Sequence, residues 1–220
     1  EEDNEYFKGL VEAYSTAKDD EKLKDIILNL YKFSMSGPWP ESWLIEKAEE
    51  FNINTLEELD KTKWVEILKD NIRVEVEGFI NMYHKAIELI SDTEGLEAYL
   101  DTFRGDLECL ENVYESLNYG LSEIYAALNG VVFTKLKTVR KSAVVDENAQ
   151  ETVKSIRDAV KKKIKSLTED SFTITPEESL QGIKDVYPYM KELSRITLDL
   201  LNKFNEKKRE KNLLDFNDLE

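Results

Sequence analysis

Basic side chains gather in one stretch of an otherwise acidic chain. Residues 131–165 hold ten Lys and Arg against four Asp and Glu, whereas the whole sequence has a formal net charge of −16. Lysine and arginine bind phosphates and release condensed counterions from a nucleic-acid backbone. The stretch therefore predicts contact with phosphates that does not depend on base sequence. The candidates are Lys135, Lys137, Arg140, Lys141, Lys154, Arg157, Lys161, Lys162, Lys163 and Lys165.

The acidic residues of the same chain offer an alternative interpretation. Residues 1–130 hold 12 Lys and Arg against 30 Asp and Glu, and residues 131–220 hold 18 against 16. A basic helix face can be simply solvated and paired with the acidic half of its own chain. Charge alone leaves both interpretations open.

Residue types that carry out catalysis are scarce. His84 is the only histidine, and a lone histidine on the flank of a long amphipathic helix is usually structural. The single Cys109 is interpreted as a buried thiol in a reducing compartment. Glutamates cluster along the predicted helices but lack the Glu-x-x-His pairs of di-metal sites. None of the eight glycines precedes Lys-Ser or Lys-Thr, so the nucleotide-binding phosphate loop is absent. We predict no catalytic residue, no metal site and no cofactor in this chain.

The elements that must position the basic residues are predicted to be helices, because apolar residues recur at helical spacing along most of the chain. A long helix is expected at about 61–90, with Trp64 and Ile67 in its apolar stripe. A second helix at about 96–117 is expected to return along it as an antiparallel hairpin. The expected fold class is all-α, a multi-helix, bundle-like domain with one long hairpin.

The pattern changes after Gly130. Residues 131–145 contain no acid and alternate loosely, so an extended segment or loop is expected there. Helix resumes at Asp146, and Thr175-Pro176-Glu177-Glu178 combines a cap, a first-position proline and a third-position carboxylate. The last helix is expected to bend or restart at Pro188, since proline removes an amide donor.

The helices are interpreted as one unit, with possible sub-lobes at 1–130 (acidic) and 131–212 (mixed or basic). No apolar run is long enough to cross a bilayer. The chain begins without Met or a targeting segment, and we interpret it as an excised piece of a longer protein.

The last residues resemble a junction found in UvrD-like helicases. Lys207, Lys208 and Arg209 precede the motif Asp215-Phe216-Asn217-Asp218-Leu219. In these helicases a helix rich in Lys and Arg leads into Asp-Phe-x-Asp-Leu, which marks the return from a helical insertion into the first ATPase lobe. Residues 213–220 would be the truncated start of that return.

Further segments are similar, in order, to AddA, the helicase–nuclease subunit of bacterial AddAB. They are Phe7-x-x-Leu10-Val11-Glu12-Ala13-Tyr14-Ser15, Leu30-Tyr31-Lys32-Phe33, Pro40-Glu41-Ser42-Trp43-Leu44 and Phe133-x-x-Leu136-Lys137-x-x-Arg140. The stretch 55–130 matches only in helical character and acidity.

The resemblance implies that residues 1–212 are a helical insertion subdomain of the first motor lobe. The parent protein would be a cytoplasmic, nucleoid-associated ATP-dependent helicase and exonuclease that uses ATP and Mg, pairs with AddB and processes double-strand breaks for recombination. The subdomain would touch duplex DNA ahead of the motor, and further DNA-contact candidates that could extend the basic surface are Lys203, Lys207, Lys208, Arg209 and Lys211. The alternative is a docking or scaffolding domain without direct DNA contact.

Overall fold

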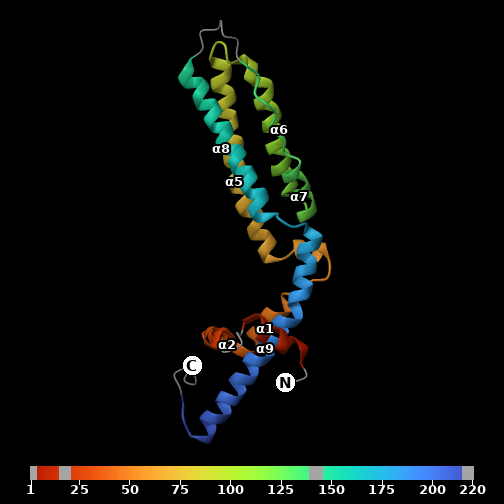
Figure 1. Cartoon of the computed structure of the whole chain (residues 1–220). Coiled ribbons are helices and arrows are strands. Elements are labelled where there is room, and N and C mark those ends of the chain that lie inside the picture. The colour runs from red at the N-terminus through yellow and green to blue at the C-terminus, as the bar shows by residue number, and fades with distance from the viewer. Residues whose placement is uncertain (1–3, 15–20, 139–145, 215–220) are drawn as a thin grey trace. The chain divides into compact units, whose positions relative to one another are not determined.

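The computed structural model describes residues 4–14, 21–138 and 146–214, and it confirms the all-α prediction, because these residues form helices and no strand (Figure 1). The chain divides into two compact units, which we treat separately. Unit 1 comprises residues 1–54 and 180–220, and unit 2 comprises residues 55–179.

Unit 2 is a bundle built around a long helical hairpin. Its elements are α4 (Leu56–Asp60), α5 (Lys63–Asp92), the 3-10 turn η1 (Glu97–Tyr99), α6 (Leu100–Ser116), α7 (Leu121–Asn129) and α8 (Glu147–Ser171). The expected hairpin is confirmed, since α6 returns along α5; α8 also packs on α5, and α7 contacts both α6 and α8. The fully buried side chains of this core include Val76, Tyr83, Phe103, Leu110, Ile124 and Val153.

Local signals in the sequence set the helix starts. The Thr55 hydroxyl accepts from the Glu58 amide while the Glu58 carboxylate accepts from the Thr55 amide, which closes a capping box at α4. Thr175 and Glu178 form the same reciprocal pair where α9 (Pro176–Glu210) begins. Both predicted caps are therefore present.

The described residues that follow α7 are not helical, as expected. Residues 131–138 lie in neither helix nor strand, and residues 139–145 lie outside the described part of the chain. The Thr134 carbonyl accepts a hydrogen bond of 2.5 Å from the Arg157 guanidinium of α8. This bond fixes the segment against the bundle.

Unit 1 contains α1 (Glu5–Tyr14), α2 (Glu21–Ser34), α3 (Pro40–Glu49) and the part of α9 that follows Ser179. Of the bend or restart expected at Pro188, the restart does not occur, because α9 continues through this residue. Both neighbours of the proline are anchored: the Tyr187 hydroxyl donates to Glu49 at 2.7 Å, and the Tyr189 ring packs edge-on against Tyr6. These contacts hold the helix on both sides of Pro188.

The charge boundary expected near residue 130 does not coincide with a boundary between units. Residue 130 lies inside unit 2. The helix before it in the sequence, α7, packs against the helix after it, α8. Compact units follow buried contacts, whereas charge follows the exposed faces, so the two divisions need not agree. The assignment of residues 1–212 to an insertion subdomain stays a prediction.

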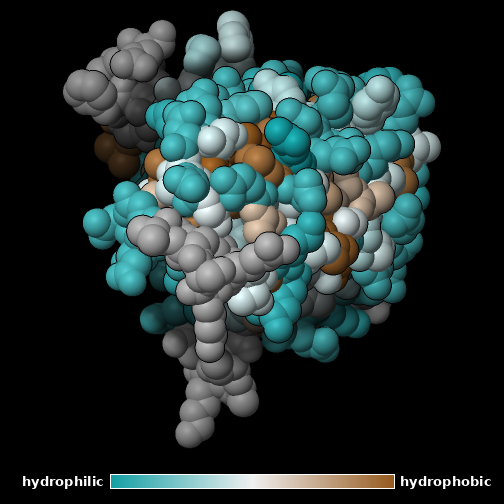
Figure 2. Space-filling model, turned by 90° about the horizontal axis from the view of Figure 1, so that it is seen from above, coloured by the Kyte–Doolittle hydropathy of each residue, from teal (hydrophilic) through white to brown (hydrophobic). Residues whose placement is uncertain are grey.

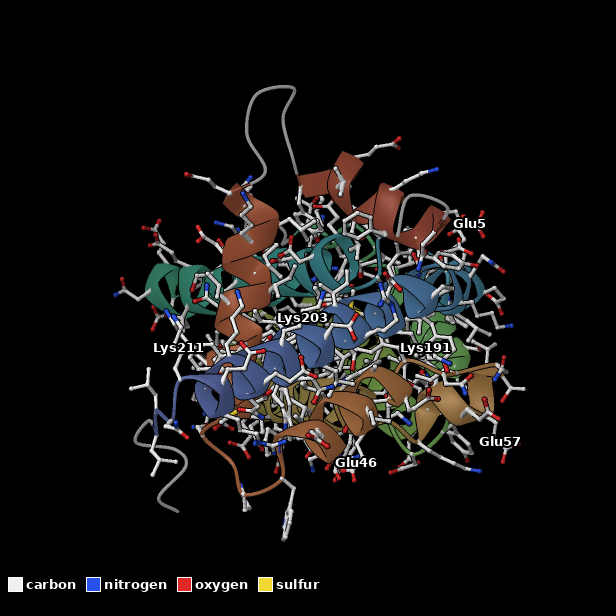
Figure 3. All side chains as sticks on the ribbon, turned by 90° about the horizontal axis from the view of Figure 1, so that it is seen from below. Glu5, Glu46, Glu57, Lys191, Lys203 and Lys211 are labelled. Atoms are coloured by element: carbon white, nitrogen blue, oxygen red, sulfur yellow. The ribbon has the colours of Figure 1, made fainter. Side chains whose placement is uncertain are left out.

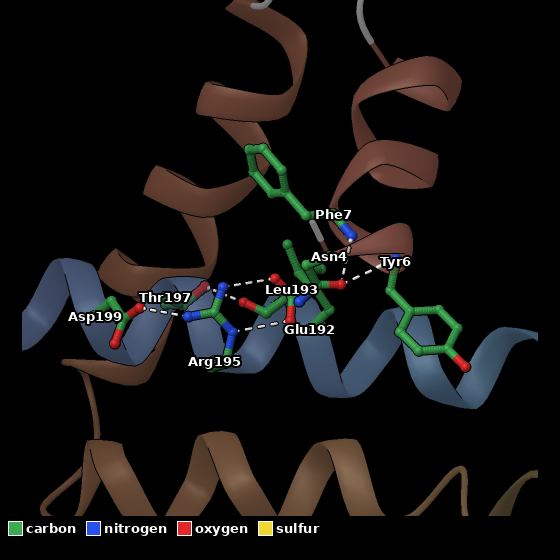
Figure 4. Close-up of polar contacts among 8 residues, drawn as sticks. All are labelled: Asn4, Tyr6, Phe7, Glu192, Leu193, Arg195, Thr197 and Asp199. Carbon is green, nitrogen blue, oxygen red and sulfur yellow. Dashed lines mark hydrogen bonds and ion pairs between the residues drawn. The ribbon is translucent and has the colours of Figure 1, made fainter. Parts of the chain in front are cut away.

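A polar cluster joins the start of α1 to α9 (Figure 4). The Asn4 side chain accepts from the amides of Tyr6 and Phe7, and Arg195 donates to both Glu192 and Asp199. The Glu192 side chain is buried. The hydrogen bond from Arg195, opposed by burial and aided by Asn4, lowers the pKa of Glu192.

This lowered pKa predicts an acid-dependent loss of stability in unit 1. A carboxyl with a depressed folded-state pKa stabilises the fold above its unfolded pKa, here 4.5, and the contribution is lost as the pH falls through the folded value. We expect Glu192→Gln to flatten the decline of unfolding free energy below pH 4.5 in denaturant titrations. Glu46→Gln, an exposed change on α3, is the control, and equal curves for both variants would contradict the prediction.

Candidate nucleic-acid interface

Helix α8 presents most of the candidate basic residues. Val153, Val160 and Ile164 are buried at helical spacing and turn one face of α8 toward the bundle. Lys161 and Lys162 follow Val160 directly. Because successive side chains of a helix point about 100° apart, these two lysines point in other directions than the buried Val160. The consecutive Lys161, Lys162 and Lys163 are all exposed, Lys165 is also exposed, and Lys154 is half-buried.

Arg157 differs from the other candidates because it is buried. It is 5% exposed, and its guanidinium contacts the Asp106 carboxylate at 2.6 Å and 3.3 Å. The Tyr83 hydroxyl donates to the same carboxylate at 3.2 Å, and the guanidinium lies 5.7 Å from the Phe133 ring centroid. The structure thus places Arg157 inside the bundle, away from any phosphate at the surface.

The electrostatics of this cluster raise the pKa of two of its groups, Arg157 and Tyr83. Burial opposes the charge of Arg157, but hydrogen bonds and the charge of Asp106 outweigh it and raise the pKa of the guanidinium. Burial, reinforced by the Asp106 charge, raises the pKa of the Tyr83 hydroxyl far above its ordinary value. Arg157 is therefore a permanently charged link between α6, α8 and the 131–138 segment.

Two exposed candidates are paired with acids of the same chain, as the alternative interpretation expects. Lys137 contacts Asp101 at 2.7 Å, and Lys165 contacts Glu169 at 3.4 Å. Such exposed ion pairs contribute little to stability, so the lysine can readily exchange its carboxylate partner for a phosphate. Lys135 is exposed without an ion pair among the described residues, whereas Arg140 and Lys141 lie outside them.

An open pocket of about 400 Å³ adjoins the lysines of α8. Lys161 and Lys165 form one wall, and Phe133 of the extended segment contributes to the other. The remaining lining residues are Leu128, Asn129, Val131, Val132, Ile164, Thr168 and Glu169. The basic surface is thus hollowed where α8 meets the chain that follows α7.

The second basic group, at the end of α9, belongs to unit 1. Lys207 and Arg209 are exposed, but Lys208 is 8% exposed and its ammonium lies 5.2 Å from the Phe204 ring centroid. Lys203 lies on the same stretch of α9, and Lys211 follows its last residue (Figure 3). The motif residues Asp215, Phe216, Asp218 and Leu219 lie outside the described part of the chain.

Groups that could hold a metal or a nucleotide are not found in the described ranges. No three His, Cys, Asp or Glu side chains gather there into a metal site, and His84 is exposed. Cys109 is half-buried, less enclosed than expected. The residues described do not fit ATP or Mg. No described helix is long and apolar enough to cross a membrane.

Sequence reasoning missed the partners of Arg157. Asp106 stands 51 residues before it and shares the helical spacing of Phe103 and Leu110 on the buried face of α6. The one signal available in the sequence was Asp106 itself, an acid at a helical position whose neighbours on the same face are apolar. A buried carboxylate requires a cationic or hydrogen-bonded partner, so this position indicated that such a partner exists.

The described residues define an all-helical type of domain with exposed lysines along α8. Comparisons agree with the resemblance noted in the sequence, although no family model matches the chain. Across its full length it is 47% identical to the AddA subunit of the ATP-dependent helicase/nuclease of Clostridium botulinum and 38% identical to that of Acetivibrio thermocellus. The corresponding protein of Clostridium perfringens is 45% identical over 99% of the chain.

The chain spans only about 18% of the length of these curated relatives. It therefore corresponds, over its whole length, to one segment of the AddA subunits of ATP-dependent helicase/nucleases, and the resemblance to AddA is confirmed.

Proposed function

We propose that this chain is the helical insertion subdomain in the first motor lobe of an ATP-dependent DNA helicase and exonuclease, and that it contacts duplex DNA through phosphates ahead of the motor. The names of the relatives support a helicase and nuclease role for the parent protein. The parent would act in the bacterial cytoplasm at the nucleoid, in double-strand break repair, together with a second subunit of the AddB type.

The observation that carries the DNA contact is the run Lys161-Lys162-Lys163. These lysines are exposed and have no ion pair among the described residues, and Lys161 also lines the pocket beside α8. Unpaired lysines in an acidic chain are strongly hydrated cations that exchange water for phosphate at little cost. Arg157 and Lys208 are excluded from the surface because they are buried.

A salt titration tests this proposal. Reversing all three charges (Lys161→Glu, Lys162→Glu, Lys163→Glu) is expected to weaken binding to duplex DNA by about tenfold or more at roughly 50 mM salt, and to flatten the salt dependence by up to about 0.9 per lost contact. Fluorescence anisotropy with labelled duplex at several salt concentrations measures both quantities.

The matched control makes the same charge change elsewhere on unit 2, at Lys61, Lys63 and Lys85. This triple variant carries the same net charge but leaves α8 intact, so its salt slope is expected to stay near that of the unaltered chain. Equal losses in the two triple variants, or no binding by the unaltered chain even at low salt, would refute direct contact through α8.

The ATP and Mg of the parent protein would be held by residues outside this segment, since neither a phosphate loop nor a metal site is found in the residues described here.

The alternative function is a docking role without DNA contact. One observation favours it, namely the exposed apolar residues on one side of α5.

A further inference from the structure

Helix α5 has two apolar faces, and only one of them packs into unit 2. Its inner face carries the buried Val65, Ile72, Val76, Phe79, Tyr83, Ala86 and Ile90. Other apolar residues of α5 stay exposed: Ile67 at 50%, Val74 at 72% and Met82 at 36%. Ile67, expected in the buried stripe, therefore belongs to the second face.

These three apolar residues lie on one side of the helix, with the polar Asn71 and the glycine Gly78 between them. Ile67, Asn71, Val74, Gly78 and Met82 follow one another at spacings of three or four residues, which places them on one side of α5. We call this set the α5 outer row. At 1.5 Å per residue it is roughly 22 Å long, about four helical turns. Single exposed apolar residues need no explanation, whereas exposed apolar residues aligned on one side of a helix point to an interaction surface.

Gly78 makes the middle of the row accessible to another backbone. A Cβ placed at this position would meet no atom within 4 Å, so open space lies above the helix there. Glycine in a helix interior is less favourable than alanine. Because Gly78 has no side chain, the backbone of another helix can approach α5 closely between Val74 and Met82.

The charges beside the row define the chemistry of its occupant. From Glu66 to Glu88 the exposed charged side chains of α5 are five carboxylates and the ammonium of Lys85, and two further cations, Lys69 and Arg73, are half-buried. Of the carboxylates, only Glu66 has an ion pair among the described residues, with Lys63 at 2.8 Å. An acidic border repels nucleic acid and attracts a cationic partner.

Other occupants fit the row less well. A lipid surface requires a polar face rich in Lys and Arg, which α5 lacks. Figure 2 shows that hydrophobic side chains also reach the surface between hydrophilic ones on the face seen from above. Scattered exposure of that kind differs from the linear row, whose spacing matches the ridge of a packed helix.

We propose that the α5 outer row is the docking site for an amphipathic helix whose apolar stripe is bordered by Lys or Arg, and that this helix belongs to a second subunit of the parent assembly. The source of the helix rests on the proposed function, since the relatives are named as one subunit of a helicase/nuclease. The row lies on α5, whereas the lysines proposed to contact DNA lie on α8, so one unit carries two surfaces of opposite charge.

The first arm of the test uses designed peptides and this chain. A helical peptide with leucines at matching spacing and lysine borders is expected to bind at least about tenfold more tightly than the same peptide with glutamate borders. Ile67→Glu combined with Val74→Glu is expected to reduce binding of the lysine peptide by about tenfold or more. Both positions are exposed, so the fold is expected to be retained, which circular dichroism checks.

Val132→Glu is the matched control, because Val132 is 66% exposed and lies outside α5. It is expected to leave peptide affinity unchanged. Equal affinity for lysine- and glutamate-bordered peptides, or unchanged binding in the Ile67/Val74 double variant, would overturn the docking site.

The second arm uses the full-length protein expressed with its second subunit. The double variant is expected to raise the dissociation constant of the assembly by about tenfold, measured by analytical ultracentrifugation or interferometry. Unchanged assembly would overturn the assigned occupant. Binding of duplex DNA by the double variant is measured in parallel: weakened assembly with intact DNA binding supports both proposals, whereas failure of DNA binding in the unaltered protein contradicts only the proposed function.

Discussion

Replacing Arg157 by Met is expected to lower the unfolding free energy of unit 2 by about 3–5 kcal/mol. The substitution leaves the Asp106 carboxylate, which is 3% exposed, buried beside Tyr83 without its cation. An uncompensated buried charge costs far more than the lost attraction itself, because the carboxylate has been removed from water. Denaturant titration followed by circular dichroism measures the loss.

A second variant separates lost charge pairing from lost packing. Combining Arg157→Met with Asp106→Leu replaces the ion pair by apolar groups, and we expect most of the lost stability to return. Arg209→Met, at an exposed position of α9, is the control and is expected to change stability by less than about 0.5 kcal/mol. A single Arg157→Met variant as stable as this control would contradict the assigned role.

The same substitution also affects the extended segment. Without the guanidinium, the Thr134 carbonyl loses its donor and the Phe133 ring loses its cation. Limited proteolysis is therefore expected to cleave residues 131–138 faster in Arg157→Met than in Arg157→Lys, which keeps the charge but loses the two-pronged contact.

Phe103→Ala is expected to destabilise unit 2 by a similar amount, about 3–5 kcal/mol. Phe103 is fully buried on α6, and its ring centroid lies 5.3 Å from that of Tyr83 on α5. Truncation removes apolar surface from the hairpin interface and leaves a cavity that the helices fill only in part. Thermal and denaturant unfolding measure the change.

Two further substitutions calibrate this result. Phe103→Leu retains most of the volume and is expected to cost less than Phe103→Ala. Phe33→Ala, at a position 65% exposed on α2, is expected to stay within about 0.5 kcal/mol of the unaltered chain. If truncation at Phe103 cost no more than truncation at Phe33, the α5–α6 interface would not be the core described here.

The local features of the fold could be predicted from the sequence. The capping boxes at Thr55–Glu58 and Thr175–Glu178 involve residues three apart, so no distant contact is needed to specify them. The long hairpin follows from apolar periodicity and from the turn residues after Asp92. The missing phosphate loop is likewise a property of the sequence alone. The resemblance to AddA depended on ordered local motifs and survived comparison with whole relatives.

Tertiary contacts decided which of those residues remain available for binding. Arg157 and Lys161 stand on the same helix in the same basic run, yet one pairs in the core with an acid 51 residues away and the other is exposed. Ile67 follows a helical period but faces outward, because α5 carries two apolar rows and only one can meet its neighbours. The sequence by itself determined the helices, the local caps and the excess of charge, since these arise between near neighbours. Only the packing of distant helices determined which faces are buried, because burial depends on what each face meets.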